Sequence, residues 1–272
     1  MTQAGRIQAV VFDLDDTLYP ERDYVASGYQ AVCQHLHRTG LTALPSAGPL
    51  GDTLPPAANI ASAVNRPAVA SRTGGFAAPT NLLGPSECFG FLWLRFLAGE
   101  SAGAFDALSE AFGLGLSKDQ VQELVTVYRE HRPRIEPYGG MAELLGRLHE
   151  GYRLGLLSDG YQPAQLLKLE ALELARFFDV IVFTEDHGRA AWKPCEDCFR
   201  LIAGRLEAPP EACCYVADNP AKDFVAPNRM GWRTIQYLRP GQIKSTNEAP
   251  EGGWPQVVVG SPQALRDALR TQ

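Results

Sequence analysis

The feature that most constrains the fold is a short apolar segment that recurs along the chain and ends each time in polar residues. Runs this short and this apolar are typical of central strands in a parallel sheet, where both faces are buried. The polar residues then emerge together at the carboxyl ends of the strands. The segments are 10–12 before Asp13, 154–157 before Ser158, 180–183 before Thr184 and 213–217 before Asp218.

Helical patterns lie between most of these segments. Apolar residues near helical spacing predict helices over 141–149, 163–172, 195–206 and 221–230. Strands that alternate with helices imply right-handed crossovers and an open parallel sheet with helices on both faces. The sequence therefore predicts an α/β fold with a doubly wound parallel sheet.

The alternation is interrupted after the first strand, where the chain reads as helix only. Helices are expected over 21–38, 89–97, 105–112 and 118–131, enough for a small bundle. We therefore predict a sheet-containing core of 1–19 and 136–272, with a helical cap at 20–135 inserted into it.

Within the predicted cap, a segment at about 40–86 is rich in Ala, Pro and Gly and almost uncharged. It has too few large apolar residues to build a core of its own. We expect a flexible loop or disordered insert, with an irregular but ordered loop as the alternative.

Charge and composition exclude several classes of partner. The formal charge of -6 and pI near 5.4 argue against nucleic acid, which is bound by clustered Lys and Arg.

No signal peptide, anchor or membrane span is indicated, and the six cysteines look like reduced residues of a cytoplasmic protein. The pair Cys195 and Cys198 is interpreted as helix packing, since zinc normally needs four ligands. A monomer and a homodimer are equally compatible with the sequence.

Two acidic clusters follow predicted strands. Asp13 and Asp15 are two residues apart, so their side chains should share one pocket where open α/β sheets bind ligands. Read alone, they could also be a solvated acidic turn that caps a helix. Asp218 and Asp223 follow another strand, and three or four converging carboxylates suit Mg²⁺ rather than zinc.

A hydroxyl and a cation complete the pattern. Ser158 ends its own strand, and Lys193 is expected to open a helix with Pro194 in its first turn. Lys193 could hold a phosphate there, although a single lysine is more often only a surface charge.

The segments Asp13-Leu14-Asp15-Asp16-Thr17-Leu18, Ser158, Lys193-Pro194, and Asp218 with Asp223 resemble the four ordered motifs of the haloacid dehalogenase-like superfamily. The resemblance covers about 7–19 and 136–240, and it favours the phosphatase-like branch with a helical cap after the first motif. One departure is Ala217, where the family pattern usually has Gly.

The resemblance implies the roles of the acidic residues. Asp13 would attack phosphorus to give an aspartyl-phosphate, and Asp15 would protonate the leaving oxygen and later activate water. Mg²⁺ would be held by the Asp13 carboxylate, the Asp15 backbone carbonyl and Asp218, with Asp223 in support.

The resemblance also implies a phosphate-binding set and a substrate class. Ser158 and Lys193 would bind the transferring phosphoryl oxygens, with Asp159 and Thr17 beside them. The expected activity is Mg²⁺-dependent hydrolysis of a small phosphorylated metabolite, such as a sugar phosphate or nucleoside monophosphate.

Other functions remain as alternatives. A phosphomutase would use the same intermediate and release no net phosphate. A dehalogenase would need neither metal nor Asp15, and a signalling receiver domain would carry its accepting aspartate on a later strand, without an inserted cap. A non-catalytic phosphate-binding module is the remaining alternative.

Overall fold

The computed structural model describes residues 6–41, 84–244, 246 and 248–270. The chain divides into two compact units. The core unit comprises Met1–Val25 and Arg132–Gln272, and the helical unit comprises Ala26–His131. The helical unit begins at Ala26 and ends at His131, whereas the predicted cap covers 20–135, so the two differ by a few residues at each end. Most of the insert expected at about 40–86 lies outside the described residues.

The core unit contains a six-stranded sheet in the order β3-β2-β1-β4-β5-β6. Every neighbouring pair is parallel, which confirms the predicted α/β sheet. The strands are β1 (Ala9–Phe12), β2 (Arg153–Ser158), β3 (Val180–Phe183), β4 (Cys213–Ala217), β5 (Arg233–Tyr237) and β6 (Val257–Val259).

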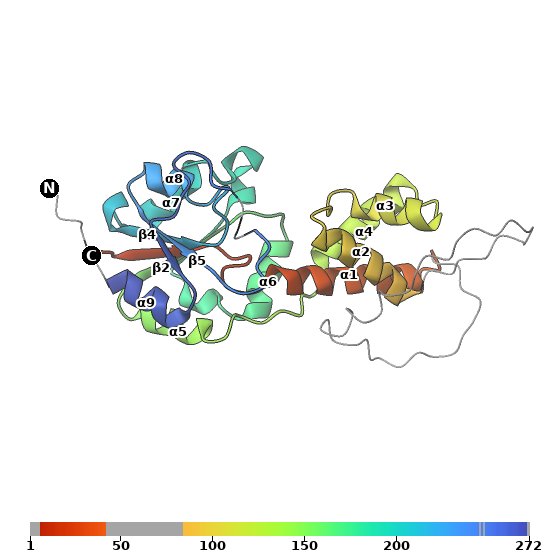
Figure 1. The fold of residues 1–272 in the computed structure, drawn as a ribbon, viewed down its shortest axis with the longest axis horizontal. Helices are drawn as coiled ribbons and strands as arrows, with labels where there is room; N and C mark the ends of the chain where they lie inside the picture. The colour runs from red at the N-terminus through yellow and green to blue at the C-terminus, as the bar shows by residue number, and fades with distance from the viewer. Residues whose placement is uncertain (1–5, 42–83, 245, 247, 271–272) are drawn as a thin grey trace, which may run out of the picture. The chain divides into compact units, whose positions relative to one another are not determined.

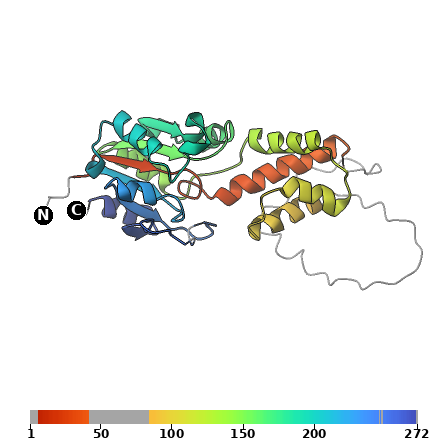
Figure 2. The ribbon, with the colours of Figure 1, turned by 90° about the horizontal axis from the view of Figure 1, so that it is seen from above.

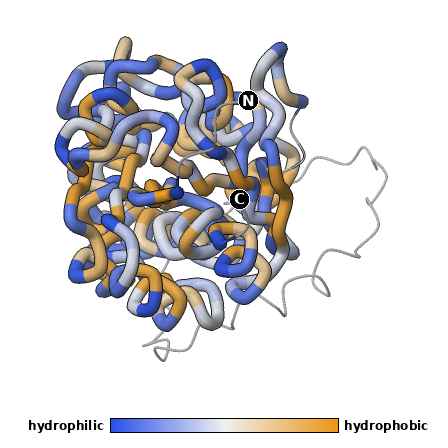
Figure 3. The backbone as a smooth tube through the Cα atoms, turned by 90° about the vertical axis from the view of Figure 1, so that its left-hand side faces the viewer, coloured by the Kyte–Doolittle hydropathy of each residue, from blue (hydrophilic) through white to orange (hydrophobic). Residues whose placement is uncertain are grey.

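Helices cover both faces of the sheet. In Figure 1, α5 and α9 lie on one face, and α7 and α8 lie on the other. Hydrophobic and hydrophilic stretches alternate along the backbone (orange and blue in Figure 3), and the residues of β1, β2 and β4 are almost all buried. The helices of this unit are α5 (Met141–His149), α6 (Ala164–Leu172), α7 (Asp197–Arg205), α8 (Val225–Arg229) and α9 (Pro262–Arg270).

Two predicted helices are shorter than expected. The helix expected over 195–206 begins at Asp197. Lys193 therefore lies in a turn before the helix, and the prediction that it opens the helix was wrong. The helix expected over 221–230 begins at Val225, because the preceding residues form a turn closed by the Asp223 carboxylate. In both places the charged residue, Lys193 or Asp223, lies in a loop, and the helix begins after that loop.

The helical unit confirms the predicted helical insertion after the first strand. Its helices are α1 (Glu21–Arg38), which begins in the core unit, α2 (Pro85–Leu97), α3 (Ala104–Phe112) and α4 (Lys118–Glu130). Figure 2 shows α2, α3 and α4 gathered around α1. Tyr29 of α1 packs against Phe105 and Tyr128, with ring centroids 6.4 and 5.5 Å away. A Cβ on Gly28 would lie 2.6 Å from the Tyr128 ring, so the glycine lets α1 and α4 approach closely.

Among the described residues, the helices are all too short or too polar to cross a membrane.

Candidate active site

The site lies at the carboxyl edge of three neighbouring strands. Phe12 of β1 is in register with Leu156 of β2 and with Val216 of β4. Asp13 follows β1, Ser158 ends β2, and Asp218 follows β4, so the parallel register brings these residues to one edge of the sheet.

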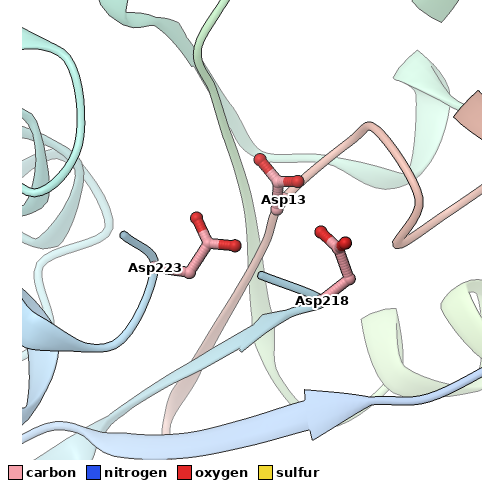
Figure 4. Close-up of side chains that lie close together, drawn as sticks. All are labelled: Asp13, Asp218 and Asp223. Carbon is pink, nitrogen blue, oxygen red and sulfur yellow. The ribbon is translucent and has the colours of Figure 1, made fainter. Parts of the chain in front are cut away.

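Three carboxylates meet at this edge. Asp13, Asp218 and Asp223 each offer an oxygen within 4.8 Å of the others, and all three residues are buried (Figure 4). Asp223 comes from the turn before α8, where its Oδ2 accepts a hydrogen bond of 2.9 Å from Asn219 N. Asp218 Oδ2 is buried without a hydrogen-bond partner.

The electrostatics of this carboxylate cluster favour bound protons or a cation. Burial and the charge of Asp223 raise the pKa of Asp13 to about 6, although the Lys193 ammonium opposes the shift. Burial and the charges of Asp223 and Asp13 raise the pKa of Asp218 well above its usual range. A divalent cation would supply the missing positive charge, and an all-oxygen donor set with an unpartnered oxygen fits Mg²⁺.

Lys193 is the cation that the chain itself provides. Its side chain is fully buried, and Nζ lies 2.6 Å from Asp13 Oδ1 and 2.8 Å from Asp223 Oδ1. Nζ also donates to Tyr215 Oη at 2.9 Å. Burial lowers the pKa of Lys193, but the charges of Asp13 and Asp223 outweigh it and hold the pKa well above its usual value. Lys193 is therefore a fixed positive charge beside Asp13.

Asp15 has a separate set of partners. Its Oδ1 accepts hydrogen bonds from Lys168 Nζ at 2.8 Å and from the Tyr19 hydroxyl, and its Oδ2 accepts one from Gln165 Nε2 at 2.9 Å. Burial raises the pKa of Asp15, but the Lys168 charge and these hydrogen bonds outweigh it and hold the pKa below its usual value. Lys168 Nζ also lies 4.1 Å from the centre of the Tyr24 ring. The Asp15 side chain thus stands outside the carboxylate cluster.

Two hydroxyls lie beside the aspartates. Ser158 is fully buried, and its Oγ accepts a hydrogen bond of 2.8 Å from Gln165 Nε2. Thr17 Oγ1 donates to Asp13 Oδ2 over 3.5 Å. The structure therefore places Thr17 beside Asp13, and it places Ser158 beside Gln165, which also contacts Asp15.

Asp159 has a carboxylate that is already engaged. Its Oδ1 accepts from Thr184 Oγ1 at 2.9 Å and from Lys193 N at 3.1 Å, and its Oδ2 accepts from Lys222 Nζ at 2.8 Å. These bonds tie the loops after β2, β3 and β4 together. A contact with an anionic phosphate would have to come from the Asp159 backbone, because its carboxylate would repel the ligand.

Sequence reasoning missed the residues that hold the acids in place. Gln165 and Lys168 are three apart on α6, so they face the same side of the helix, and this spacing was the available signal. Tyr215 lies inside the apolar run of β4, where nothing in the sequence distinguishes its hydroxyl from a packed ring.

Known proteins resemble this chain over most of its length. A model of the family described as haloacid dehalogenase-like hydrolase matches residues 7–231. A glyceraldehyde 3-phosphate phosphatase of Methanopyrus kandleri is 25% identical over 268 residues, covering 97% of each chain. The pyrophosphatase PpaX of Halalkalibacterium halodurans is 30% identical over 125 residues, which are 44% of this chain and 57% of PpaX.

Solved structures show the same fold. The putative hydrolase YfnB of Bacillus subtilis, described as bound to magnesium, aligns with a TM-score of 0.62 at 17% identity, covering 98% of this chain and all of YfnB, 100%. A putative β-phosphoglucomutase of Thermotoga maritima aligns with a TM-score of 0.60 at 18% identity, covering 98% of this chain and 100% of the other. At these identities the likeness concerns the fold alone.

Proposed function

Because the chain belongs to the haloacid dehalogenase-like hydrolase family, we propose that it is a Mg²⁺-dependent phosphatase that hydrolyses small phosphate monoesters through an aspartyl-phosphate on Asp13. The observation that carries the proposal is the convergence of distant segments on one carboxylate. Lys193 Nζ lies 2.6 Å from Asp13 Oδ1, and oxygens of Asp218 and Asp223 lie within 4.8 Å of one of the Asp13 oxygens.

Asp13 is the proposed nucleophile. One of its oxygens forms a bond to phosphorus, and the bond from phosphorus to the ester oxygen breaks, which releases an alcohol once that oxygen is protonated. Water then attacks the aspartyl-phosphate, which returns free Asp13 and inorganic phosphate. Lys193 compensates the charge of the attacking carboxylate and of the transferring phosphoryl group.

Asp15 is the proposed proton carrier for both halves of the reaction. Its lowered pKa suits the second half, where an ionised carboxylate takes a proton from the attacking water. In the first half it has to carry a proton to the leaving oxygen. The negative charge of a bound phosphate ester beside it would raise its pKa and favour that state.

Asp13, Asp218 and Asp223 are the proposed Mg²⁺ ligands, together with the Asp15 backbone carbonyl that the family resemblance adds. Bound Mg²⁺ would neutralise negative charge on the nucleophile and on the phosphoryl oxygens. Ser158, Lys193 and Thr17 are proposed to bind those oxygens, with Asp159 contributing from its backbone.

The substrate is proposed to be a small phosphorylated metabolite. Similarity along almost the whole chain to a glyceraldehyde 3-phosphate phosphatase supports a monoester of a small carbon skeleton. A sugar phosphate or a nucleoside monophosphate fits this class. The shorter similarity to PpaX adds pyrophosphate to the compounds that need testing.

A phosphate-release screen tests the proposal. The wild-type chain is incubated with sugar phosphates, nucleoside monophosphates, other small monoesters and pyrophosphate, with Mg²⁺ or with EDTA. We expect phosphate release from at least one monoester that depends on Mg²⁺ and is abolished by Asp13→Asn, while Asp119→Asn, at an exposed position on α4, stays active. A phosphomutase would convert a sugar phosphate without net phosphate release. An active Asp13→Asn variant would overturn the proposed nucleophile.

A further inference from the structure

Gln165 lies at the centre of the site, and its buried side-chain amide contacts both the acid and the phosphate-binding hydroxyl. Nε2 lies 2.9 Å from Asp15 Oδ2 and 2.8 Å from Ser158 Oγ, and it also donates to the backbone carbonyl oxygen of Asp159. Only 1% of Gln165 is exposed. An amide NH₂ group carries two hydrogens, so the three surrounding acceptors share two N–H groups.

The loop after β2 is shaped to admit this side chain. A Cβ on Gly160 would lie 2.5 Å from Gln165 Cδ and 2.6 Å from Nε2, so any other residue at this position would displace the Gln165 amide. The Gly160 φ of +144° also favours glycine. The absence of a side chain at Gly160 therefore leaves the space that the buried Gln165 amide occupies.

The hydrogen bonds constrain how Ser158 and Asp15 face a ligand. Because Ser158 Oγ accepts from Gln165, the serine proton is left for another partner, and its contact with Asp159 O is long, at 3.4 Å. Asp15 Oδ2 is held by Gln165 while Oδ1 is held by Lys168 and Tyr19. Both groups are thus oriented by contacts from one nitrogen.

We propose that Gln165 is a positioning residue that sets the Ser158 hydroxyl and the Asp15 carboxylate relative to each other. Ser158 would then donate to a phosphoryl oxygen at the same time as Asp15 faces the ester oxygen. This rests on the proposed phosphatase function and adds a residue to it. Correct relative placement of two groups that act on one reacting centre has large effects on rate.

Gln165 is a suitable residue for the test because it is uncharged. Gln165→Met keeps a side chain of similar length and leaves the ion pair between Lys168 and Asp15, 2.8 Å apart, in place. The probes are phenyl phosphate and 4-nitrophenyl phosphate, which have similar shapes and differ in the basicity of the leaving oxygen. The value of kcat/KM reports the steps up to departure of that oxygen.

We expect Gln165→Met to lower kcat/KM about 100-fold for phenyl phosphate and about tenfold for 4-nitrophenyl phosphate. Phenolate is the stronger base and needs a proton from Asp15, whereas 4-nitrophenolate can leave without one. The loss shared by the two esters reports Ser158, and the additional loss for phenyl phosphate reports Asp15. Equal losses for the two esters, or no loss, would overturn the proposal.

A double-mutant cycle separates positioning from a general structural effect. In a Ser158→Ala background, Gln165→Met should lower kcat/KM for 4-nitrophenyl phosphate by less than about threefold. In an Asp15→Asn background, it should no longer change the ratio of the two esters. Losses that multiply independently in either background would contradict action through these residues.

Two further variants provide an independent displacement of the Gln165 amide and a control. Gly160→Ala displaces the Gln165 amide without altering it, so it should change the ratio of the two esters in the same direction as Gln165→Met. Glu170→Gln, at an exposed position on α6, should leave both activities unchanged. A wild-type chain that hydrolyses neither ester and releases no phosphate in the metabolite screen would overturn the proposed function itself. An active wild type with an unchanged ester ratio in Gln165→Met would overturn only the positioning role.

Discussion

Asp13 and Asp15 of the first motif are two positions apart, yet the structure gives them opposite surroundings. Asp13 lies with Asp218 and Asp223, and the buried ammonium of Lys193 beside it is shared with Asp223. Asp15 pairs with Lys168, and Gln165 and Tyr19 add hydrogen bonds. The pKa of Asp13 is raised to about 6, and that of Asp15 is held below its usual value.

The difference indicates which side of the site lacks positive charge. Around Asp15 the protein supplies a cation and donors for both carboxylate oxygens, so little remains for a ligand to neutralise. Around Asp13, Lys193 pairs with Asp13 and Asp223, and Asp218 Oδ2 is buried without a hydrogen-bond partner. Opposite shifts on neighbouring acids are typical of sites that divide chemical roles. The Asp13 side is therefore suited to metal and nucleophile, and the Asp15 side to proton transfer.

Of the substitutions that test this comparison by turnover rate, replacement of Asp15 is expected to have the largest effect. Asp15→Asn should lower kcat for a phosphate monoester by about 10³-fold, because general acid and base catalysis are both lost. An activated ester such as 4-nitrophenyl phosphate should still phosphorylate Asp13, and the phosphorylated enzyme should accumulate because its hydrolysis lacks a base. Intact-protein mass spectrometry after acid quenching measures it. An Asp13→Asn chain is the control, and a phosphorylated form of that control would contradict the division of roles.

The next effect comes from the Asp13 side. Asp218→Asn removes one of the carboxylates that repel each other, so the metal-free protein should gain thermal stability. The same change should weaken Mg²⁺ binding about 10- to 100-fold, because the amide carries no charge. Calorimetric titration and thermal unfolding with and without Mg²⁺ measure the two quantities. A variant that loses stability without metal and keeps Mg²⁺ affinity would remove Asp218 from the metal site.

Much of this comparison could be predicted from the sequence. Apolar runs that end in Asp13, Ser158 and Asp218 identify three strand ends, and parallel pairing brings strand ends to one edge. The order of the motifs then adds Lys193. The Asp13 side was predictable because its residues sit at the boundary between buried strand and polar loop, a boundary that hydrophobicity records.

The Asp15 side was harder to predict because it depends on the orientation of a helix. Lys168 is a buried lysine, against the general tendency of that residue type, and nothing local shows that α6 turns it toward Asp15. Strand β5 escaped prediction for a related reason. It buries Thr234 and Gln236 through hydrogen bonds to Asn228 and to the Asp218 carbonyl, so its sequence looks too polar for a central strand.

The pH dependence of metal stabilisation sharpens the comparison further. At pH values between the usual pKa of an aspartate and about 6, the folded metal-free protein keeps a proton on Asp13 that the unfolded chain has lost. Raising the pH across this window therefore lowers the stability of the folded protein. Mg²⁺ binding must displace that proton, so the increase in melting temperature caused by Mg²⁺ should grow from about pH 5 to about pH 7. The Asp13 proton alone accounts for a change in Mg²⁺ affinity of about tenfold over this range. An increase that is constant over this range would show that Asp13 is already ionised in the metal-free protein.

The smallest expected effect tests how Lys193 is held. Tyr215→Phe removes the hydroxyl that accepts a hydrogen bond of 2.9 Å from Lys193 Nζ and leaves the two aspartate contacts in place. Lys193 keeps its charge compensation and loses one neutral partner, so kcat should fall about fivefold, equivalent to about 1 kcal/mol. Steady-state kinetics and Mg²⁺ titration measure the effect. Because Tyr215 acts on the lysine and not on the metal ligands, Mg²⁺ affinity should stay within about twofold. A loss of Mg²⁺ affinity as large as that of Asp218→Asn would mean that the position of Lys193 and the binding of Mg²⁺ cannot be changed separately.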